Sequence, residues 1–147
     1  MRRVAVLTSG GDAPGMNAAI RAVVRSAIYE GMEVYGIYRG FEGLMAGQFE
    51  KMSAGSVADI IHRGGTILHT SRSRDFMLSE GRNRAREHLD RLGIDSLVII
   101  GGNGSLRGGY ALSSEHAGLK IIGIPATIDN DVVYTRSIGY DTAVNTV

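Results

Sequence analysis

Cysteine is absent from this sequence of 147 residues. The chain therefore cannot form disulfides or thiolate-ligated metal sites, and its composition fits a reducing compartment. No apolar run approaches the length of a transmembrane helix. Residues 1–7 are too short and too quickly polar for a signal peptide and predict a first strand. We therefore expect a cytoplasmic protein without a membrane partner.

An excess of charge of either sign is also missing, because the formal net charge is only +1. A general binder of polyanions needs a concentrated positive surface. We therefore expect no nucleic-acid partner, although individual arginines can still contact phosphate groups.

Glycine is abundant, with 21 residues, which is about twice the average usage. The glycines cluster in short loops and form no repeat, which excludes collagen-like and low-complexity chains. Such loops let backbone N–H groups approach a ligand closely. The length is sufficient for one domain with its own hydrophobic core.

Strands and helices are predicted to alternate along the chain. Apolar, β-branched runs predict strands over 4–8, 33–38, 96–100 and 120–124, the last two of them buried. Helical spacing predicts helices over 16–30 and 79–92, a short helix over 56–61, and another after residue 105. Ser56 and Ser79 are the expected N-caps, and residues 39–44 are expected to form a loop. The order predicts an α/β fold with three layers, a mainly parallel sheet and helices on both faces.

Right-handed crossovers place all the strand-to-helix loops at one edge of such a sheet. Four segments would then meet there: the glycine turns at 10–15 and 101–105, the arginine-rich loop 63–82, and residues 125–131 with Asp129 and Asp131. Helix N-termini bind phosphate, and carboxylates after a strand can accept a proton or hold Mg²⁺. Taken singly, each glycine turn is equally typical of a plain turn between a strand and a helix. The two carboxylates, taken singly, are equally typical of a polar turn. Together they predict a phosphoryl-transfer site.

Arg21 and Arg25 lie four residues apart on the first predicted helix and therefore share one face. Two readings are open for this pair. It forms a solvated surface, or it clamps a phosphate group between two guanidinium groups.

The sequence resembles the N-terminal part of bacterial-type 6-phosphofructokinases. The matching segments are Leu7-Thr8-Ser9-Gly10-Gly11-Asp12-Ala13-Pro14-Gly15-Met16-Asn17, Arg63-Gly64-Gly65-Thr66, Gly101-Gly102-Asn103-Gly104-Ser105 and Thr127-Ile128-Asp129-Asn130-Asp131. They follow the order of the family over nearly the whole chain. The resemblance implies that residues 1–147 are the nucleotide-binding N-terminal domain of a longer enzyme, truncated inside an expected helix that starts near residue 141.

The resemblance implies transfer of the γ-phosphoryl group of ATP to the 1-hydroxyl of fructose 6-phosphate, giving fructose 1,6-bisphosphate and ADP in glycolysis. It also implies a homotetramer in the full-length form. In the family, groups that bind the sugar phosphate come from the missing part and from a neighbouring subunit. The isolated chain is therefore expected to be inactive.

Site residues follow from the same resemblance. Asp129 would be the general base, Thr127 and Ile128 would line the acceptor site with it, and Asp131 would support Mg²⁺. The implied ATP-binding residues are Gly11, Arg72, Ser73, Gly102, Asn103, Gly104 and Ser105. Arg21 and Arg25 fall on the effector site, where ADP or phosphoenolpyruvate would bind.

Two positions depart from the pattern of the family. Asn103 stands where the family carries an aspartate that holds Mg²⁺, so an oxygen ligand is kept but its charge is lost and metal affinity should fall. Ala54 stands where the effector site has a further arginine, so one phosphate contact is missing.

Two alternatives to the ATP-dependent kinase remain. Pyrophosphate-dependent relatives tend to carry aspartate and lysine at the positions of Gly104 and Ala126, whereas small residues leave room for the α-phosphate of ATP. A non-catalytic regulatory module that keeps nucleotide affinity is favoured by Asn103 and opposed by Asp129.

Overall fold

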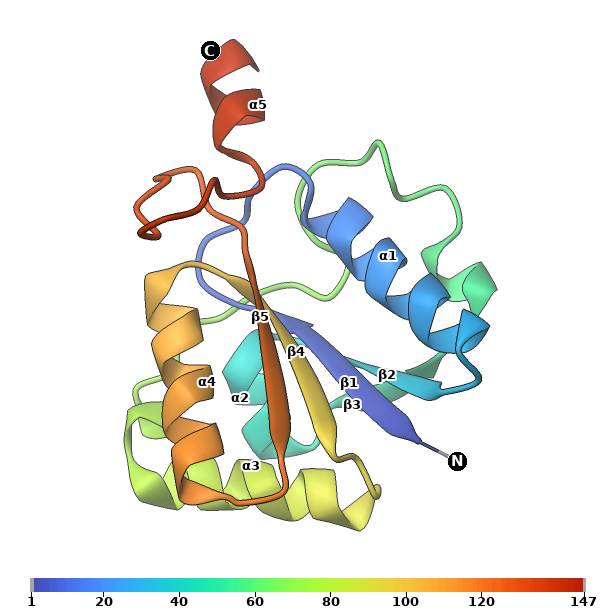
Figure 1. The fold of residues 1–147 in the computed structure, drawn as a ribbon, viewed down its shortest axis with the longest axis vertical. Coiled ribbons are helices and arrows are strands. Elements are labelled where there is room, and N and C mark those ends of the chain that lie inside the picture. The colour runs from blue at the N-terminus through green and yellow to red at the C-terminus, as the bar shows by residue number, and fades with distance from the viewer. Residues whose placement is uncertain (1, 147) are drawn as a thin grey trace.

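The computed structural model describes residues 2–146 and has a five-stranded sheet at its centre (Figure 1). The strands are β1 (Arg3–Thr8), β2 (Glu33–Ile37), β3 (Phe49–Met52), β4 (Ser96–Gly101) and β5 (Lys120–Pro125). Their order in the sheet is β3-β2-β1-β4-β5. Only β3 runs antiparallel to its neighbour, so the sheet is mainly parallel, as predicted.

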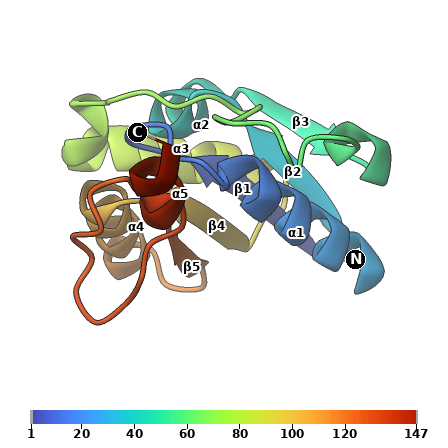
Figure 2. The ribbon, with the colours of Figure 1, turned by 90° about the horizontal axis from the view of Figure 1, so that it is seen from above.

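Helices cover both faces of this sheet, which confirms the three-layer α/β prediction (Figures 1 and 2). The helices are α1 (Met16–Tyr29), α2 (Gly40–Ala46), α3 (Ser79–Arg91), α4 (Asn103–Glu115) and α5 (Tyr140–Thr146). Helix α1 packs on one face, and α2, α3 and α4 pack on the other. Across residues 2–146, no helix is both long enough and apolar enough to cross a membrane.

Strand β1 shows how the sheet supplies both halves of the core. Successive side chains of a strand point to opposite faces. Val4 and Val6 join the apolar cluster under α1 together with Ile20, and Ala5 and Leu7 join the cluster under α2, α3 and α4. All four β1 side chains are buried, which explains why this strand is a continuous apolar run.

The prediction of a loop over residues 39–44 is wrong, because Gly40–Ala46 forms helix α2. Glycines at both ends and in the middle of this segment weaken its helical signal. The backbone enters the helix through a left-handed pair, Arg39 with φ 61° and Gly40 with φ 56°. Burial of Phe41 and Leu44 in the core outweighs the weak local propensity.

Helix caps and one strand also differ from expectation. Ser53, and not Ser56, occupies the N-cap of a short 3-10 helix that spans only Ala54–Val57, and the two serines form a reciprocal capping box. Ser79 is the first residue of α3 and makes no capping bond. The short strand β3 was not predicted, since four residues carry too little periodicity to be recognised.

Strand β5 was predicted to be buried, and this prediction is wrong. Among the described residues it pairs only with β4 and forms an edge of the sheet. Ile122 is 60% exposed, and most of the strand is exposed or half-buried. An apolar run cannot by itself distinguish a central strand from an edge strand, because both bury apolar side chains in many proteins.

Asn17 is a buried polar residue that fixes a distant loop to α1. Its Nδ2 donates to the carbonyl oxygens of Arg63 and Gly64 at 3.1 and 3.3 Å, and its Oδ1 accepts from the N–H of Ile67 at 2.7 Å. The side chain is 2% exposed. This amide therefore helps to fix the glycine loop at 63–66, together with the hydrogen bond of 2.8 Å between the hydroxyl groups of Thr8 and Thr66.

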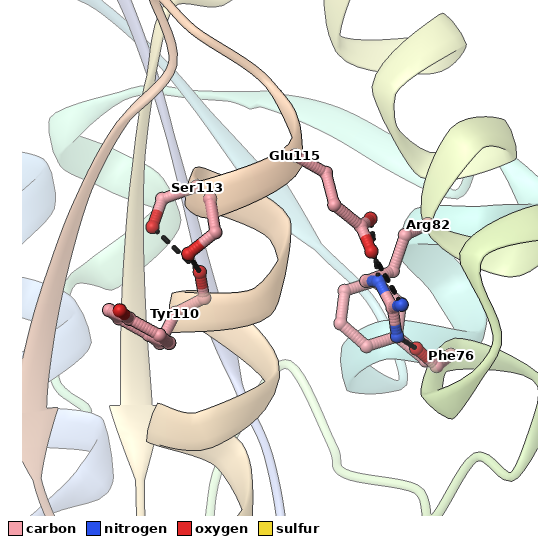
Figure 3. A network of polar contacts seen from close by, with 6 residues as sticks. Phe76, Arg82, Tyr110, Ser113 and Glu115 are labelled. Atoms are coloured by element: carbon pink, nitrogen blue, oxygen red, sulfur yellow. Dashed lines mark hydrogen bonds and ion pairs between the residues drawn. The ribbon is translucent and has the colours of Figure 1, made fainter.

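An ion pair joins α3 to α4 on the opposite face (Figure 3). Arg82 donates to both carboxylate oxygens of Glu115, at 2.7 and 2.6 Å, and to the carbonyl oxygen of Phe76 at 2.9 Å. The hydrogen bond from Arg82 and its charge hold the pKa of Glu115 below its usual value, against a smaller effect of burial.

We expect Asn17→Ala to lower the free energy of unfolding by about 2–4 kcal/mol, because three backbone groups lose their buried partner. Urea denaturation measures this loss. Asn83→Ala, on the exposed surface of α3, is the matched control and should change stability by less than about 0.5 kcal/mol. Equal effects of the two substitutions would contradict the anchoring role of Asn17.

The Arg82–Glu115 pair should stabilise the fold in a pH-dependent way. The pKa of Glu115 is lower in the folded chain than in the unfolded one, where it is about 4.3. Its contribution is therefore complete above that value and disappears as the pH falls through the folded pKa. Glu115→Gln should have a lower urea midpoint than the natural protein at pH 7, and the difference should be smaller at pH 3. An equal difference at both pH values would contradict this assignment.

Candidate active site

The order of the strands creates a crevice at the ends of β1 and β4. From β1 the chain first builds the sheet toward β2 and β3, and later continues on the other side of β1 with β4 and β5. In open α/β sheets, ligands bind outside the carboxyl ends of strands at such a reversal. The N–H of Ser9 donates to the carbonyl oxygen of Ile100 at 3.0 Å, so the turns after β1 and β4 begin side by side.

A pocket of about 360 Å³ lies at this crevice, and the four segments predicted to converge all contribute to its wall. Its volume is within the range of ligand sites. The predicted site residues that line it are Gly11, Arg72, Ser73, Gly102, Asn103, Gly104, Ser105, Thr127, Asp129 and Asp131. The prediction that these segments converge is therefore confirmed by the geometry.

The first glycine turn connects β1 to α1 along one side of the pocket. Gly10 and Gly15 have φ angles of 83° and 91°, which side chains other than glycine rarely adopt. A Cβ atom on Gly10 would lie 3.5 Å from the Ser105 Oγ, so the two turns touch. A Cβ atom on Gly11 would meet no atom within 4 Å, because this glycine faces open space in the pocket.

The second glycine turn connects β4 to α4 and is tighter. A Cβ atom on Gly101 would lie 2.6 Å from the carbonyl oxygen of Ser9 and 2.7 Å from the Ser105 Oγ. Helix α4 begins at Asn103, so free N–H groups of its first turn lie at the pocket. A Cβ atom on Gly104 would meet no atom within 4 Å, and this residue is exposed.

The loop after β5 carries both carboxylates and begins against the second glycine turn. The N–H of Ala126 donates to the carbonyl oxygen of Gly101 at 2.9 Å. A Cβ atom on Gly102 would lie 3.6 Å from the Cβ of Thr127. Asp129 and Asp131 follow within four residues and line the pocket.

Hydrogen bonds hold the shape of this loop. At its base, the N–H of Thr127 donates to the carbonyl oxygen of Ile138 at 2.9 Å, and the N–H of Ile138 donates to that of Pro125 at 3.0 Å. The N–H of Asp129 donates to the Thr127 Oγ1 at 3.2 Å. From outside the loop, the Nδ2 of Asn103 donates to the backbone carbonyl oxygen of Asp131 at 2.9 Å.

An aromatic pair forms another part of the wall. The rings of Phe41 and Phe76 stack with centroids 4.0 Å apart and an interplanar angle of 11°. Both side chains belong to the core, and both also line the pocket beside Met77 and Gly108. The sequence did not predict this wall, because no spacing links residues 41, 76 and 108.

Three predicted residues lie outside the pocket. Ile128 does not line it and is 50% exposed. Arg21 and Arg25 lie on α1, and neither lines the pocket. The Nη1 of Arg21 donates to the carbonyl oxygen of Val57 at 2.8 Å, which joins α1 to the 3-10 helix that begins at Ala54. Arg25 is exposed, so only one of the two guanidinium groups is engaged with the backbone in this way.

Oxygen atoms suited to a hard cation gather at the pocket. Two carboxylates, from Asp129 and Asp131, line it together with the amide of Asn103. Within residues 2–146, no group of three or more His, Asp or Glu side chains could enclose a metal ion. The donor set therefore fits Mg²⁺, which is often held by one or two carboxylates and the phosphates of a substrate.

Comparison with known proteins agrees with this geometry. The family model described as phosphofructokinase matches residues 3–147, which is nearly the whole chain. The chain belongs to the phosphofructokinase family. The resemblance found in the glycine turns and the Asp129 segment is therefore confirmed.

Curated relatives from this family share more than half of their aligned residues with the chain. Proteins named ATP-dependent 6-phosphofructokinase from Natranaerobius thermophilus and Bacillus subtilis are 58% and 57% identical over 148 aligned residues. The match covers 100% of this chain and 46% of each relative. The chain thus spans about half the length of these relatives.

Solved phosphofructokinases have the same fold. The structure of phosphofructokinase from Saccharomyces cerevisiae matches with a TM-score of 0.92 and 39% identity, over 98% of this chain and 22% of that one. A pyrophosphate-dependent phosphofructokinase from Nitrosospira multiformis matches with a TM-score of 0.86 over 99% of this chain and 40% of that one. At 19% identity, the second match supports the fold alone.

Two glycines of the second turn should respond in opposite ways to an added methyl group. Gly101→Ala should lower the free energy of unfolding by about 1–3 kcal/mol, because its Cβ would collide with the backbone of Ser9. Gly104→Ala should leave stability unchanged or raise it by up to about 1 kcal/mol, since the position is open and helical. Thermal and urea denaturation of both variants measure the difference. A destabilised Gly104→Ala would contradict the open space at this position.

Proposed function

We propose that the protein containing this chain transfers the γ-phosphoryl group of ATP to the 1-hydroxyl of fructose 6-phosphate. The products would be fructose 1,6-bisphosphate and ADP, as in glycolysis. The observation that carries the proposal is one pocket lined by Asp129, Asp131 and two glycine turns, with the N-terminus of α4 in its wall. Relatives that are 56–59% identical over the whole chain and named ATP-dependent 6-phosphofructokinase support it.

Asp129 is the proposed general base. Its carboxylate lines the pocket, where it would accept the proton of the attacking sugar hydroxyl. Thr127 lies beside it and holds the N–H of Asp129 through its hydroxyl, so this side chain would also shape the acceptor site. Ile128 would contribute to the acceptor site through its backbone only, because this residue does not line the pocket.

Backbone groups and Arg72 would bind the phosphates of ATP. Phosphoryl transfer spreads negative charge over the oxygens of the transferred group, and catalysis consists mainly of positioning and charge stabilisation. The N–H groups of residues 102–105 would supply fixed donors at the N-terminus of α4, and the backbone near Gly11 lies in the same wall. Arg72 supplies a positive charge, and Ser73 lies next to it in the same wall.

Mg²⁺ fits the oxygen donors of the site. Asp131 would hold it with its carboxylate, and Asn103 would contribute its amide oxygen. When bound, the ion would neutralise charge on the phosphate oxygens. Because Asn103 is neutral, we expect weaker binding of Mg²⁺ than at a site with a third carboxylate.

ATP is favoured over pyrophosphate as the donor. Gly104 leaves open space at the pocket, and Ala126 is small and buried, so neither fills the room needed by an α-phosphate. The relatives at 56–59% identity are named for ATP, which agrees with this argument.

Arg21 and Arg25 are proposed to bind an anionic effector, ADP or phosphoenolpyruvate, away from the pocket. Their position on α1 beside the 3-10 helix leaves Arg25 exposed for such a contact. Ala54 removes one possible cation from this surface, so we expect a weak effector response. We further propose a cytoplasmic homotetramer for the full-length protein.

The proposal predicts turnover by the full-length protein with fructose 6-phosphate, Mg²⁺ and ATP, and little or none with pyrophosphate. A coupled assay of ADP or fructose 1,6-bisphosphate formation measures it. Asp129→Asn should lower kcat at least about 100-fold, because general-base catalysis contributes about 10²–10⁴-fold.

Asp90→Asn is the matched control, since it makes the same chemical change in an exposed ion pair on α3 and should leave kcat unchanged. Turnover with pyrophosphate alone would overturn the donor assignment. Nucleotide binding without turnover with either donor would refute the kinase and favour a regulatory module.

A further inference from the structure

Asn103 uses its amide as a hydrogen-bond donor to the loop that carries the two carboxylates. Its Nδ2 donates a hydrogen bond of 2.9 Å to the backbone carbonyl oxygen of Asp131. The two residues are 28 positions apart, one at the start of α4 and the other in the loop after β5. An ionised carboxylate has no hydrogen to donate, so an aspartate at 103 would place an oxygen against the carbonyl oxygen of Asp131.

The loop held by this bond is the one that positions both carboxylates. It is fixed at its base by the two backbone bonds between 125–127 and Ile138. Its interior is braced locally, since the Asn130 Oδ1 accepts from the N–H of Ser137 at 3.2 Å. Asn130 itself has a φ of 49°, an uncommon conformation for a residue other than glycine. The bond from Asn103 attaches the far side of the loop to a helix.

We propose that Asn103 is a positioning residue that latches the 127–138 loop to α4 without the help of a metal ion. Its N–H group links the start of the helix directly to the Asp131 carbonyl oxygen. The loop would therefore hold Asp129 and Asp131 in place before nucleotide or Mg²⁺ arrives. The consequence for catalysis rests on the proposed function, but the latch itself does not.

The latch makes a distinct prediction for an aspartate at this position. Asn103→Asp has the same shape but loses the donor and adds a charge. Two facing oxygens repel, unless a cation lies between them. The order of the loop should therefore become dependent on Mg²⁺ in this variant, whereas it is independent of Mg²⁺ in the natural protein.

Hydrogen exchange of the full-length protein, without nucleotide or sugar, tests the latch. We expect amides in 127–138 to exchange at least tenfold faster in Asn103→Ala than in the natural protein, with or without magnesium chloride. In Asn103→Asp they should exchange faster without magnesium chloride and slow again when it is added. Asn83→Asp is the matched control on the exposed surface of α3 and should exchange like the natural protein.

Unchanged exchange of 127–138 in both Asn103 variants would overturn the proposal, as would faster exchange in Asn103→Asp that Mg²⁺ does not reverse. If Asn103→Ala unfolds, β1 and β4 also exchange quickly, and the isosteric Asn103→Asp then decides. Turnover adds a second readout. Asn103→Ala should lower kcat about 10- to 100-fold, with a smaller change in the KM for ATP, because the base is misplaced. Since exchange is measured without substrate, an inactive protein with a latched loop would refute the kinase and leave the latch standing.

Discussion

The close contact between the ends of β1 and β4 is the constraint on which the site depends. The register pairs Thr8 with Ile100, so the two strands end at the same level. The turns that follow then run against each other, and the backbone of Ser9 fills the space beside Gly101. Because there is no room for a side chain at that point, the turns after two neighbouring strands can line one pocket, with the N-terminus of α4 in its wall.

The pocket carries a modest negative charge for a site that would bind phosphates and a divalent cation. Asp129 and Asp131 supply two carboxylates, Arg72 supplies one positive charge, and Asn103 is neutral. A third carboxylate would increase the attraction for a cation and also the repulsion between acidic groups when no cation is present. The neutral amide of Asn103 avoids this repulsion. Under the proposed latch it orders the 127–138 loop in the free protein, and the attraction of the site for a cation is lower as a result.

Much of this arrangement could be predicted from the sequence, because its signals are local. The strand at 96–101 is an apolar run bounded by glycine, and the rule for strand-to-helix connections places the turn that follows at one edge of the sheet. The α2 segment could not be predicted, since its helix is stabilised by burial of Phe41 and Leu44 and not by propensity. The exposure of β5 depends on what packs beside it, and no residue of the strand encodes that.

The site shows the same division between local and long-range information. Glycines and carboxylates at the ends of strands predicted that the two glycine turns, Asp129 and Asp131 would meet in one site. The hydrogen bond from Asn103 to Asp131 spans 28 positions and joins a side chain to a carbonyl group, which any residue could provide. The stacked wall of Phe41 and Phe76 likewise brings together two residues that no pattern connects.

That stacked pair has a consequence for how the protein can change over evolutionary time. The same two rings fill the core beneath α2, α3 and α4 and shape the pocket. A substitution of either ring that changes ligand binding would therefore also disturb the packing of the core. A substitution of either ring that raises stability would also change the shape of the pocket. Adaptation on this side of the pocket should be slow, and should proceed through the exposed Met77 rather than through the rings.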